Sequence, residues 1–362
     1  MPETTDPYAV SAFVDLCVSE LALCGVREGE AVAVLSQGRE RLEYADAFLL
    51  AARRLGAVAY HVRVPDPSPG RVDGVVWTIG VTELARNRAA VQALARADLV
   101  IDLLFMLFSP EQLEIQAAGA RILLVVEPID VLARLLPTLE LRARVQAGEE
   151  LLSRARRLRV TSPAGTDISY RLGQYSVIGE YGYTDTPGRW DHWPSGFLFT
   201  NGNDGGVDGR VVLAPGDIVI APFRTYVTDR VTITVERGHV VEIRGSGTTA
   251  GLLTDYMDEF ADDPRRTEVA HIGWGCNERA RWSRLATAQR GFGMEARAFH
   301  GCVMFATGPN AELGGTNTSA CHLDIPMRGC SLYLDDEPVL LDGEFQIAEL
   351  GAPGLAAVRS RR

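Results

Sequence analysis

The sequence contains no lysine, and all 36 of its basic residues are arginine. Schiff-base aldolases, pyridoxal-phosphate enzymes, P-loop nucleotidases, protein kinases and Ser-Lys hydrolases each need a lysine amine at a fixed place. The Gly-x-Ser-x-Gly motif of one class of serine hydrolases is also missing. These absences exclude several chemistries, so polar catalysis must come from histidines, carboxylates or a bound metal.

Long hydrophobic runs and paired cysteines are missing as well. No stretch of about 18 apolar residues occurs, and no charged segment followed by an apolar one stands at the start. The six cysteines form no Cys-x-x-Cys pair, which favours a cytoplasmic protein with free thiols. A formal net charge of -11 argues against nucleic acid or a membrane as partner, because either would need a basic surface.

The first half of the chain shows the pattern of an α/β domain. A chain of 362 residues exceeds the size at which a single core stops growing, about 250–300 residues, which favours two domains. Short apolar runs predict strands at 31–35, 58–64, 74–79, 99–104 and 121–126, and helical spacing predicts helices at 42–55, 81–97 and over most of 129–159. Alternating strands and helices predict a parallel sheet, and we assign this α/β domain to residues 1–155.

The pattern changes after about residue 155. Turn residues separate pairs of strands, which predicts hairpins at 229–235 with 239–244, and at 333–341 with 344–349 around Asp342-Gly343. Helices are expected at 249–262 and 277–288. We therefore predict an α+β, mainly antiparallel domain over residues 156–362, which carries the metal-binding catalytic site.

His322 and Asp324 form the sharpest local pattern for chemistry. In a strand, residues two apart point to the same face with about 6.5–7 Å between their Cα atoms, so both side chains can reach one metal ion. His271, which ends a short apolar run followed by glycines, is the natural third ligand. Two histidines and one carboxylate form the facial triad of non-haem Fe(II), but they also suit Zn(II) with an activated water. Residue types alone therefore leave oxygenation and hydrolysis open.

Two tryptophans flank a histidine in the segment 180–196, which is rich in turn residues and is expected to be a loop. Tryptophan is costly to expose, so Trp190 and Trp193 belong either to the wall of a pocket that stacks a flat ring or to a loop folded over the core. The acid-base residues Glu180, Asp191 and His192 in the same segment favour the pocket.

Residues 268–275, the 308–310 turn with 312–315, and residues 322–324 together resemble the 2,5-dihydroxypyridine 5,6-dioxygenase family. That family shares the fold of the M29 thermophilic metallo-aminopeptidases, to which residues 165–168 are also similar. The resemblance implies a mononuclear Fe(II) held by His271, His322 and Asp324. It also implies that O₂ opens a hydroxylated pyridine ring, giving N-formylmaleamate from 2,5-dihydroxypyridine.

The resemblance further implies that Glu180 and His192 contact the substrate, and Trp190, Trp193 and Arg189 are added from their residue types. His192 is the candidate acid/base, because an imidazole with a pKa near ~6.5 exchanges a proton at neutral pH. Glu180 would accept a hydrogen bond from the ring N–H or a hydroxyl. Phe105 stands in a segment, 102–108, where the family pattern has a histidine and this chain has none. The expected substrate-binding residues are Glu180, His192, Trp190, Trp193, Phe105 and Arg189, the last for an anionic substituent.

The alternative is a metallo-aminopeptidase or related hydrolase of the same fold. It needs a second metal, for which Glu268 and His300 are the convincing extra ligands. The Trp-rich segment and the scarcity of clustered carboxylates favour the dioxygenase. We expect a small aromatic substrate and O₂ as partners and a homo-oligomer, and the sequence does not choose the ring substituents.

Overall fold

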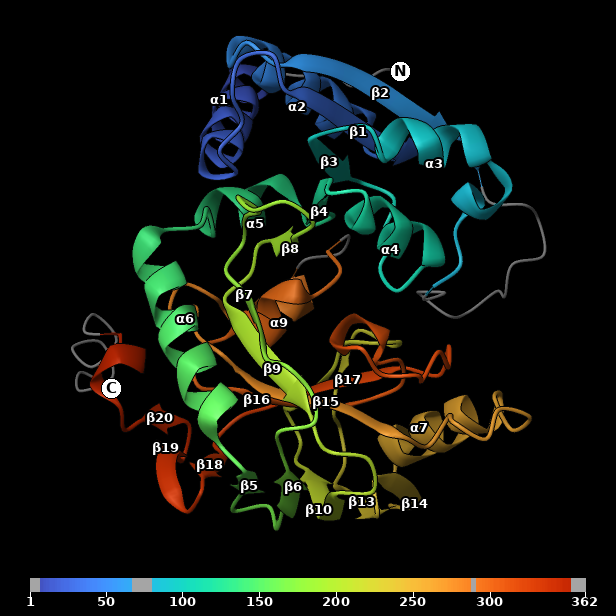
Figure 1. Cartoon of the computed structure of the whole chain (residues 1–362). Coiled ribbons are helices and arrows are strands. Elements are labelled where there is room, and N and C mark those ends of the chain that lie inside the picture. Colours follow the sequence, from blue (N-terminus) through green and yellow to red (C-terminus); the bar gives the residue numbers. More distant parts are fainter. Residues whose placement is uncertain (1–6, 67–79, 288–290, 353–362) are drawn as a thin grey trace. The chain divides into compact units, whose positions relative to one another are not determined.

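The computed structural model describes residues 7–66, 80–287 and 291–352 (Figure 1). The chain divides into two compact units that are not continuous in sequence. The first takes in residues up to Pro137 and then Tyr181–Ser195, and the second takes in Thr138–Glu180 and the chain from Gly196 onward. The two compact units interleave in sequence because the chain returns to the first unit for one strand. The domain boundary between residues 155 and 156 stays a prediction.

The first unit is built on a parallel sheet, as predicted. Its strand order is β2-β1-β3-β4-β8, and every pair in it is parallel. The central strands are buried along their whole length, which is typical of a parallel sheet covered on both faces. The strands are β1 (Ala31–Gln37), β2 (Val58–Val64), β3 (Leu99–Asp102), β4 (Arg121–Val125) and β8 (Trp190–Trp193).

The helices of the first unit differ in part from the prediction. Helix α1 was not predicted from the sequence, because a charged residue, Glu20, stands among its buried apolar residues. Helix α4 was also missed, although Ser109 caps it by accepting a hydrogen bond from the Gln112 N–H at 3.1 Å. The predicted helix 81–97 is two pieces, since Asn87 starts a new helix, and the predicted strand 74–79 lies outside the described residues. The helices are α1 (Pro7–Leu23), α2 (Leu42–Arg54), η1 (Glu83–Arg86), α3 (Arg88–Leu94), α4 (Pro110–Ala117) and α5 (Ile129–Arg134).

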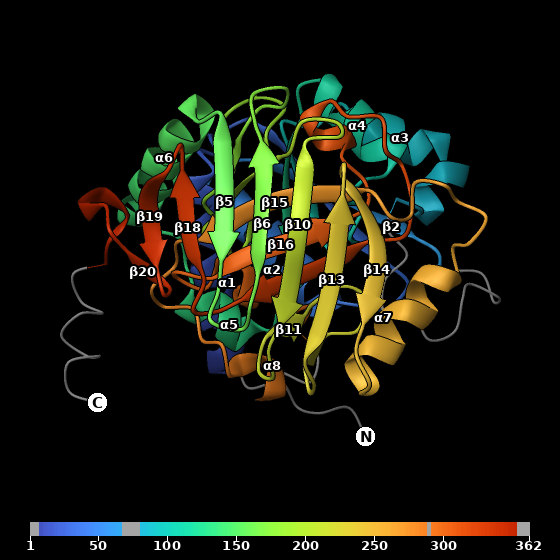
Figure 2. The same cartoon turned by 90° about the horizontal axis from the view of Figure 1, so that it is seen from below.

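The second unit is α+β with antiparallel sheets, as predicted. Its larger sheet has the order β14-β13-β10-β6-β5-β18-β19-β20, and a smaller one has the order β17-β16-β15-β9-β7. Figure 2 looks onto the larger sheet, with β15 and β16 of the smaller sheet seen behind it. The smaller sheet comprises β7 (Ile178–Glu180), β9 (Phe197–Asn201), β15 (Val269–Gly275), β16 (Val303–Thr307) and β17 (Leu323–Met327).

The remaining elements of this unit complete the larger sheet, a short two-stranded sheet and the helices. The larger sheet comprises β5 (Arg157–Thr161), β6 (Asp167–Arg171), β10 (Val207–Leu213), β13 (Val231–Glu236), β14 (His239–Arg244), β18 (Ser331–Leu334), β19 (Glu337–Leu341) and β20 (Glu344–Phe345). The others are β11 (Ile218–Val219), β12 (Thr225–Tyr226), α6 (Leu139–Arg154), α7 (Thr248–Asp258), α8 (Arg284–Thr287), α9 (Met294–Ala298), η2 (Ala311–Leu313) and η3 (Ala348–Leu350). The predicted helix 129–159 is therefore split into α5 and α6.

The two predicted hairpins have different outcomes. The hairpin of β13 and β14 is confirmed. The second hairpin is confirmed around Asp342-Gly343, where β19 pairs with β20. Its first arm is not a single strand over 333–341, because Asp335 and Asp336 both have a positive φ, 48° and 75°, and turn the chain back between β18 and β19. Positive φ at both central residues is typical of a two-residue hairpin turn, which aspartate tolerates better than most residues.

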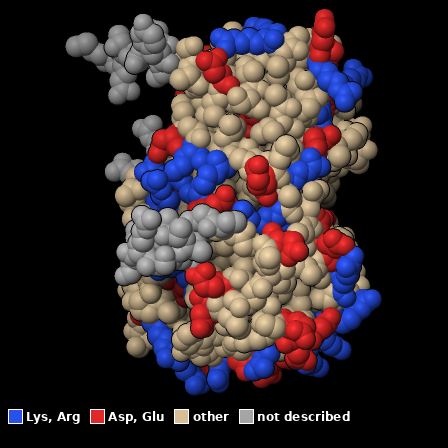
Figure 3. Space-filling model, turned by 90° about the vertical axis from the view of Figure 1, so that its left-hand side faces the viewer, with Lys and Arg blue, Asp and Glu red and all other residues tan. Residues whose placement is uncertain are grey.

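The surface carries arginine and acidic side chains side by side. On the face drawn in Figure 3 the two signs are intermingled. Several arginines are paired, as with Arg159 and Asp167, whose atoms Nε and Oδ1 are 2.8 Å apart. Within the described part of the chain, no helix is long and apolar enough to cross a membrane.

Candidate functional site

The three predicted metal ligands lie at the five-stranded sheet. His271 and Asp324 belong to its strands, and His322 directly precedes β17. His271 on β15 lies opposite Asn201 on β9, and Asp324 on β17 lies opposite Ala306 on β16. Farther along, Phe197 on β9 lies opposite Glu180 on β7. Because paired residues share a face and side chains alternate along a strand, the sheet register places these groups on the same side. A register irregularity on β15 between Val269 and Ile272 falls at His271, and such bulges re-aim side chains.

The three predicted ligands are brought together. Oδ1 of Asp324 lies 3.0 Å from Nε2 of His271 and 3.3 Å from Nε2 of His322. Burial alone would raise the pKa of Asp324, but the two imidazoles hold it well below its usual range. Burial lowers the pKa of His271 despite the neighbouring carboxylate. The cluster therefore offers an anionic oxygen and a neutral imidazole at neutral pH, which are the protonation states that metal binding requires.

His322 is held in one orientation by the backbone. Its Nδ1–H donates a hydrogen bond to the Thr307 carbonyl oxygen at 2.8 Å. This turns Nε2 toward Asp324, an arrangement that is common for metal-binding histidines. The backbone N–H of His322 donates to the Tyr256 hydroxyl at 3.0 Å, which anchors the same residue from the other side.

Two polar atoms in this cluster lack a well-formed hydrogen bond. His271 Nε2 and Asp324 Oδ1 are buried and close, but neither makes a hydrogen bond of good geometry within the described residues. Across those same ranges, no group of three or more His, Cys, Asp or Glu side chains meets the full spacing of a metal site. Instead the carboxylate contacts both imidazoles directly. The donor types and the two unsatisfied atoms fit a cation bound between them.

An apolar wall stands beside His271. Phe197 and Phe199 stack with ring centroids 5.4 Å apart, and the Phe199 ring is 5.0 Å from that of His271. Both rings belong to a buried cluster with Met304 and Leu313. Only Leu313 stands in a motif noted from the sequence, 312–315, although the apolar pattern of β9 marks it as a buried strand. The wall keeps water from one side of the cluster.

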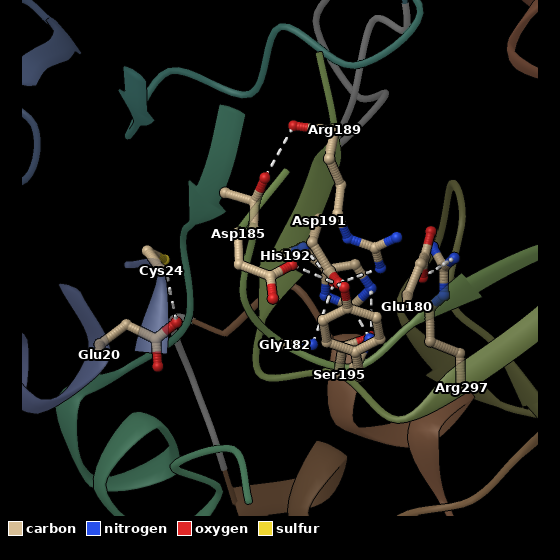
Figure 4. Close-up of polar contacts among 12 residues, drawn as sticks. Glu20, Cys24, Glu180, Gly182, Asp185, Arg189, Asp191, His192, Ser195 and Arg297 are labelled. Carbon is tan, nitrogen blue, oxygen red and sulfur yellow. Dashed lines mark hydrogen bonds and ion pairs between the residues drawn. The ribbon is translucent and has the colours of Figure 1, made fainter. Parts of the chain in front are cut away.

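Glu180 makes a fully buried ion pair with Arg297 of α9. Oε2 of Glu180 and Nη2 of Arg297 are 3.0 Å apart, as Figure 4 shows, and the guanidinium also lies 4.7 Å from the Phe197 ring centre. Burial, and then the charge of Glu180, raises the pKa of a second carboxyl, Glu312, to about 8, so this group is protonated at neutral pH. Arg297 and Glu312 were both missed. Glu312 lies within a motif that carries the family resemblance, whereas no motif marks Arg297.

The segment around His192 is not the loop that its composition predicts. Residues 190–193 form β8, which pairs in parallel with β4, from Ile122 opposite Trp190 to Val125 opposite Trp193. Alternation along the strand puts Trp190 and His192 on one face, with ring centroids 5.6 Å apart, and Trp193 on the other. The prediction failed because the partner strand is distant in sequence and the four residues carry no local strand pattern.

The Asp191 carboxylate holds the backbone of this segment in place through hydrogen bonds. Its carboxylate accepts hydrogen bonds from the backbone N–H groups of Tyr181, Gly182 and His192, at 2.9, 3.2 and 2.8 Å (Figure 4). It also pairs with Nη2 of Arg189 at 2.9 Å. The Arg189 guanidinium is therefore engaged by Asp191 and lies 3.9 Å from the Tyr181 ring centre. Its predicted role toward an anionic substituent stays a prediction.

Phe105 follows β3 in a strained backbone conformation. Its φ is 74°, in the left-handed region that bulky residues rarely adopt. The buried Asp102 carboxylate holds the turn by accepting the N–H groups of Leu104, Phe105 and Met106, each at 2.9 Å. Burial raises the pKa of Asp102 to about 6, against the opposing effect of these N–H groups.

The two extra ligands considered for a second metal have other partners. Nε2 of His300 donates to the Leu350 carbonyl oxygen at 3.1 Å, and its ring packs edge-on against Phe345. The Glu268 carboxylate lies 3.8 Å from Nε of Arg265. Neither contact favours a second metal beside the first.

The fold places the chain among proteins with the architecture of the M29 aminopeptidases. The solved structure of AmpT from Thermus thermophilus is similar with a TM-score of 0.57, and the match covers 93% of this chain and 100% of that one. Because only 17% of the residues are identical, this likeness shows the fold alone.

The chain belongs to the 2,5-dihydroxypyridine 5,6-dioxygenase family. The family model matches residues 12–347. The 2,5-dihydroxypyridine 5,6-dioxygenase of Pseudomonas putida KT2440 is 47% identical over 333 residues, which cover 91% of this chain and 94% of that protein. A solved structure of the dioxygenase from the same strain has a TM-score of 0.90 and 44% identity, covering 94% of this chain and 99% of that one. The predictions of the fold and of a ring-cleaving dioxygenase are confirmed.

Proposed function

We propose that this chain binds Fe(II) through His271, His322 and Asp324 and uses O₂ to open the ring of 2,5-dihydroxypyridine, giving N-formylmaleamate. The observation that carries the proposal is the approach of both imidazoles to one carboxylate oxygen, at 3.0 and 3.3 Å. Bound Fe(II) would supply open coordination positions and the redox chemistry toward O₂ that side chains lack. The hydrogen bond from Nδ1 to the Thr307 carbonyl oxygen would leave Nε2 of His322 to hold the metal.

Residues of the second unit would orient the substrate. The Glu180 carboxyl group is positioned by its ion pair with Arg297, and we propose that it accepts a hydrogen bond from a substrate hydroxyl or ring N–H. Phe197 and Phe199 exclude water on the side of His271, which strengthens polar interactions there.

The remaining proposed roles belong to residues of the first unit. His192 is the proposed acid/base, since an imidazole exchanges protons near neutral pH. Its Nε2 lies 3.3 Å from the Ser195 hydroxyl, which can hold or pass on that proton. Trp190 shares the His192 face of β8 and would contact the ring. The other proposed substrate residues are Trp193, Phe105 and Arg189.

We also propose that the protein acts as a homo-oligomer in the cytoplasm, with a small aromatic substrate and O₂ as its partners. All six cysteines are buried free thiols, which suits a reducing compartment. Light scattering gives the oligomer directly.

The test is metal analysis of anaerobically purified protein followed by O₂ uptake with 2,5-dihydroxypyridine. Wild-type protein should contain one iron per chain and consume O₂, and His322→Ala should lose both. His239→Ala is the matched control, because that histidine lies on β14 and contacts Thr267 instead. Retention of iron and O₂ uptake by His322→Ala would overturn the ligand assignment. Two zinc or cobalt ions with peptide cleavage would instead support an aminopeptidase.

A further inference from the structure

Asn201, at the end of β9, is a buried amide for which the described residues provide no hydrogen-bond partner. Only 2% of the residue is exposed, and neither Oδ1 nor Nδ2 makes a hydrogen bond within the described residues. Buried polar groups in native proteins are almost always paired, because leaving one unpaired costs about 1–3 kcal/mol. An amide with both its donor and its acceptor unsatisfied therefore indicates that something else binds there.

The position of Asn201 points to the proposed metal and substrate site. It lies directly opposite His271 in the register of β9 and β15, so both side chains share one face of the sheet. The preceding residue, Thr200, points to the opposite face, and its hydroxyl donates to the Ser176 carbonyl oxygen at 2.8 Å. The unsatisfied side chain is therefore the one that faces the site.

The chemistry of an amide narrows what can bind. Its carbonyl oxygen accepts and its NH₂ donates, and the two lie side by side. A matching group must present a donor next to an acceptor. The lactam form of a 2-hydroxypyridine does so, since its ring N–H adjoins the carbonyl oxygen at C2.

We propose that Asn201 binds this lactam edge of the substrate and so determines specificity for a pyridone ring over other hydroxylated rings. Its Oδ1 accepts from the ring N–H, and its Nδ2 donates to the oxygen at C2. This inference rests on the proposed function. Because Asn201 takes the ring N–H, the partner of Glu180 is then a substrate hydroxyl. A site built to pair with a polar edge rejects analogues that lack it.

The test compares two ligands on the Fe(II)-loaded protein without O₂. 2,5-Dihydroxypyridine carries the lactam edge, and 3-hydroxypyridine lacks the oxygen that completes it. Replacing the amide in Asn201→Leu should weaken binding of 2,5-dihydroxypyridine about ten- to a hundredfold, as expected for two lost hydrogen bonds. Binding of 3-hydroxypyridine should change by less than about threefold, since it makes fewer of those bonds. Thr200→Val, on the same strand but the opposite face, should bind both ligands as the wild type does.

A second measurement needs no variant. N-methyl-5-hydroxy-2-pyridone lacks the N–H donor, so the wild-type protein should bind it about tenfold or more weakly than 2,5-dihydroxypyridine. Equal losses for both ligands in Asn201→Leu would overturn the inference, as would tight binding of the methylated ring. If the wild-type protein neither binds 2,5-dihydroxypyridine nor consumes O₂ with it, the proposed function fails instead.

Discussion

Gly308 lies directly against His322: a Cβ atom at position 308 would stand 3.0 Å from both Cα and Nδ1 of the histidine, and 2.7 Å from the Cys321 carbonyl oxygen. The φ of Gly308 is +115°, which adds backbone strain for any other residue. We expect Gly308→Ala to displace His322 and to lower iron affinity about ten- to a hundredfold, as disturbing the surroundings of a ligand does. Competitive chelator titration measures that affinity.

Gly314 supplies the control for this prediction. Its φ is +83°, but a Cβ there meets nothing within 4 Å, so Gly314→Ala carries the backbone strain without the collision. Gly314→Ala should keep iron affinity close to that of the wild type. If both alanine variants lost iron equally, contact with His322 would not be the cause.

Arg297 forms an ion pair with the Glu180 carboxylate, which is buried away from water. Replacing it in Arg297→Met removes the guanidinium from the buried Glu180 carboxylate, and breaking such a buried pair costs about 3–5 kcal/mol. Urea unfolding of the metal-free protein should show this loss. The double variant Glu180→Gln/Arg297→Met should recover much of it, because no charge remains buried. The exposed pair of Arg159 and Asp167 is the contrast, and Arg159→Met should cost no more than about 1 kcal/mol.

Glu312 gives the metal-free protein a pH dependence of known sign. Burial, followed by the charge of Glu180, raises the pKa of this carboxyl from 4.5 to about 8. The native state therefore holds a proton that the unfolded state releases, and this contribution is full below about 4.5 and lost as the pH rises through about 8. Relative to Glu312→Gln, the wild-type free energy of unfolding should fall over that range by up to about 1.4 kcal/mol per pH unit. Glu337→Gln, at an exposed position of β19, should run parallel to the wild type.

Asp191 should prove a positioning residue for His192. Its carboxylate accepts three backbone N–H groups and one guanidinium N–H, and an asparagine at this position would turn a donor toward some of them in place of an acceptor. We therefore expect Asp191→Asn to lower kcat with full iron content and to shift the pH profile of kcat. Asp208 accepts the backbone N–H of Arg237 at the surface, so Asp208→Asn should leave kcat and its pH profile unchanged. An unaltered pH profile in Asp191→Asn would show that its role is structural only.

The approach of His322 to Asp324 was predictable from sequence because their spacing is local. His322 and Asp324 stand two apart, and the period of a strand is enough to put both side chains on one face. Arg297 could not be predicted in this way, because the need for it arises only when Glu180 is buried by a strand pairing far along the chain. The same limit applies to β8. Its four residues become a strand only through β4, and composition alone made them a loop.

The return of the chain for β8 also bears on the order of events during synthesis. A ribosome releases β5, β6 and β7 of the second unit before it releases the strand that finishes the sheet of the first. Large chains tend to fold one domain at a time during synthesis, which adds about 5–20 residues per second. Here the first unit must wait, with β4 forming its sheet edge, until Trp193 has left the exit tunnel.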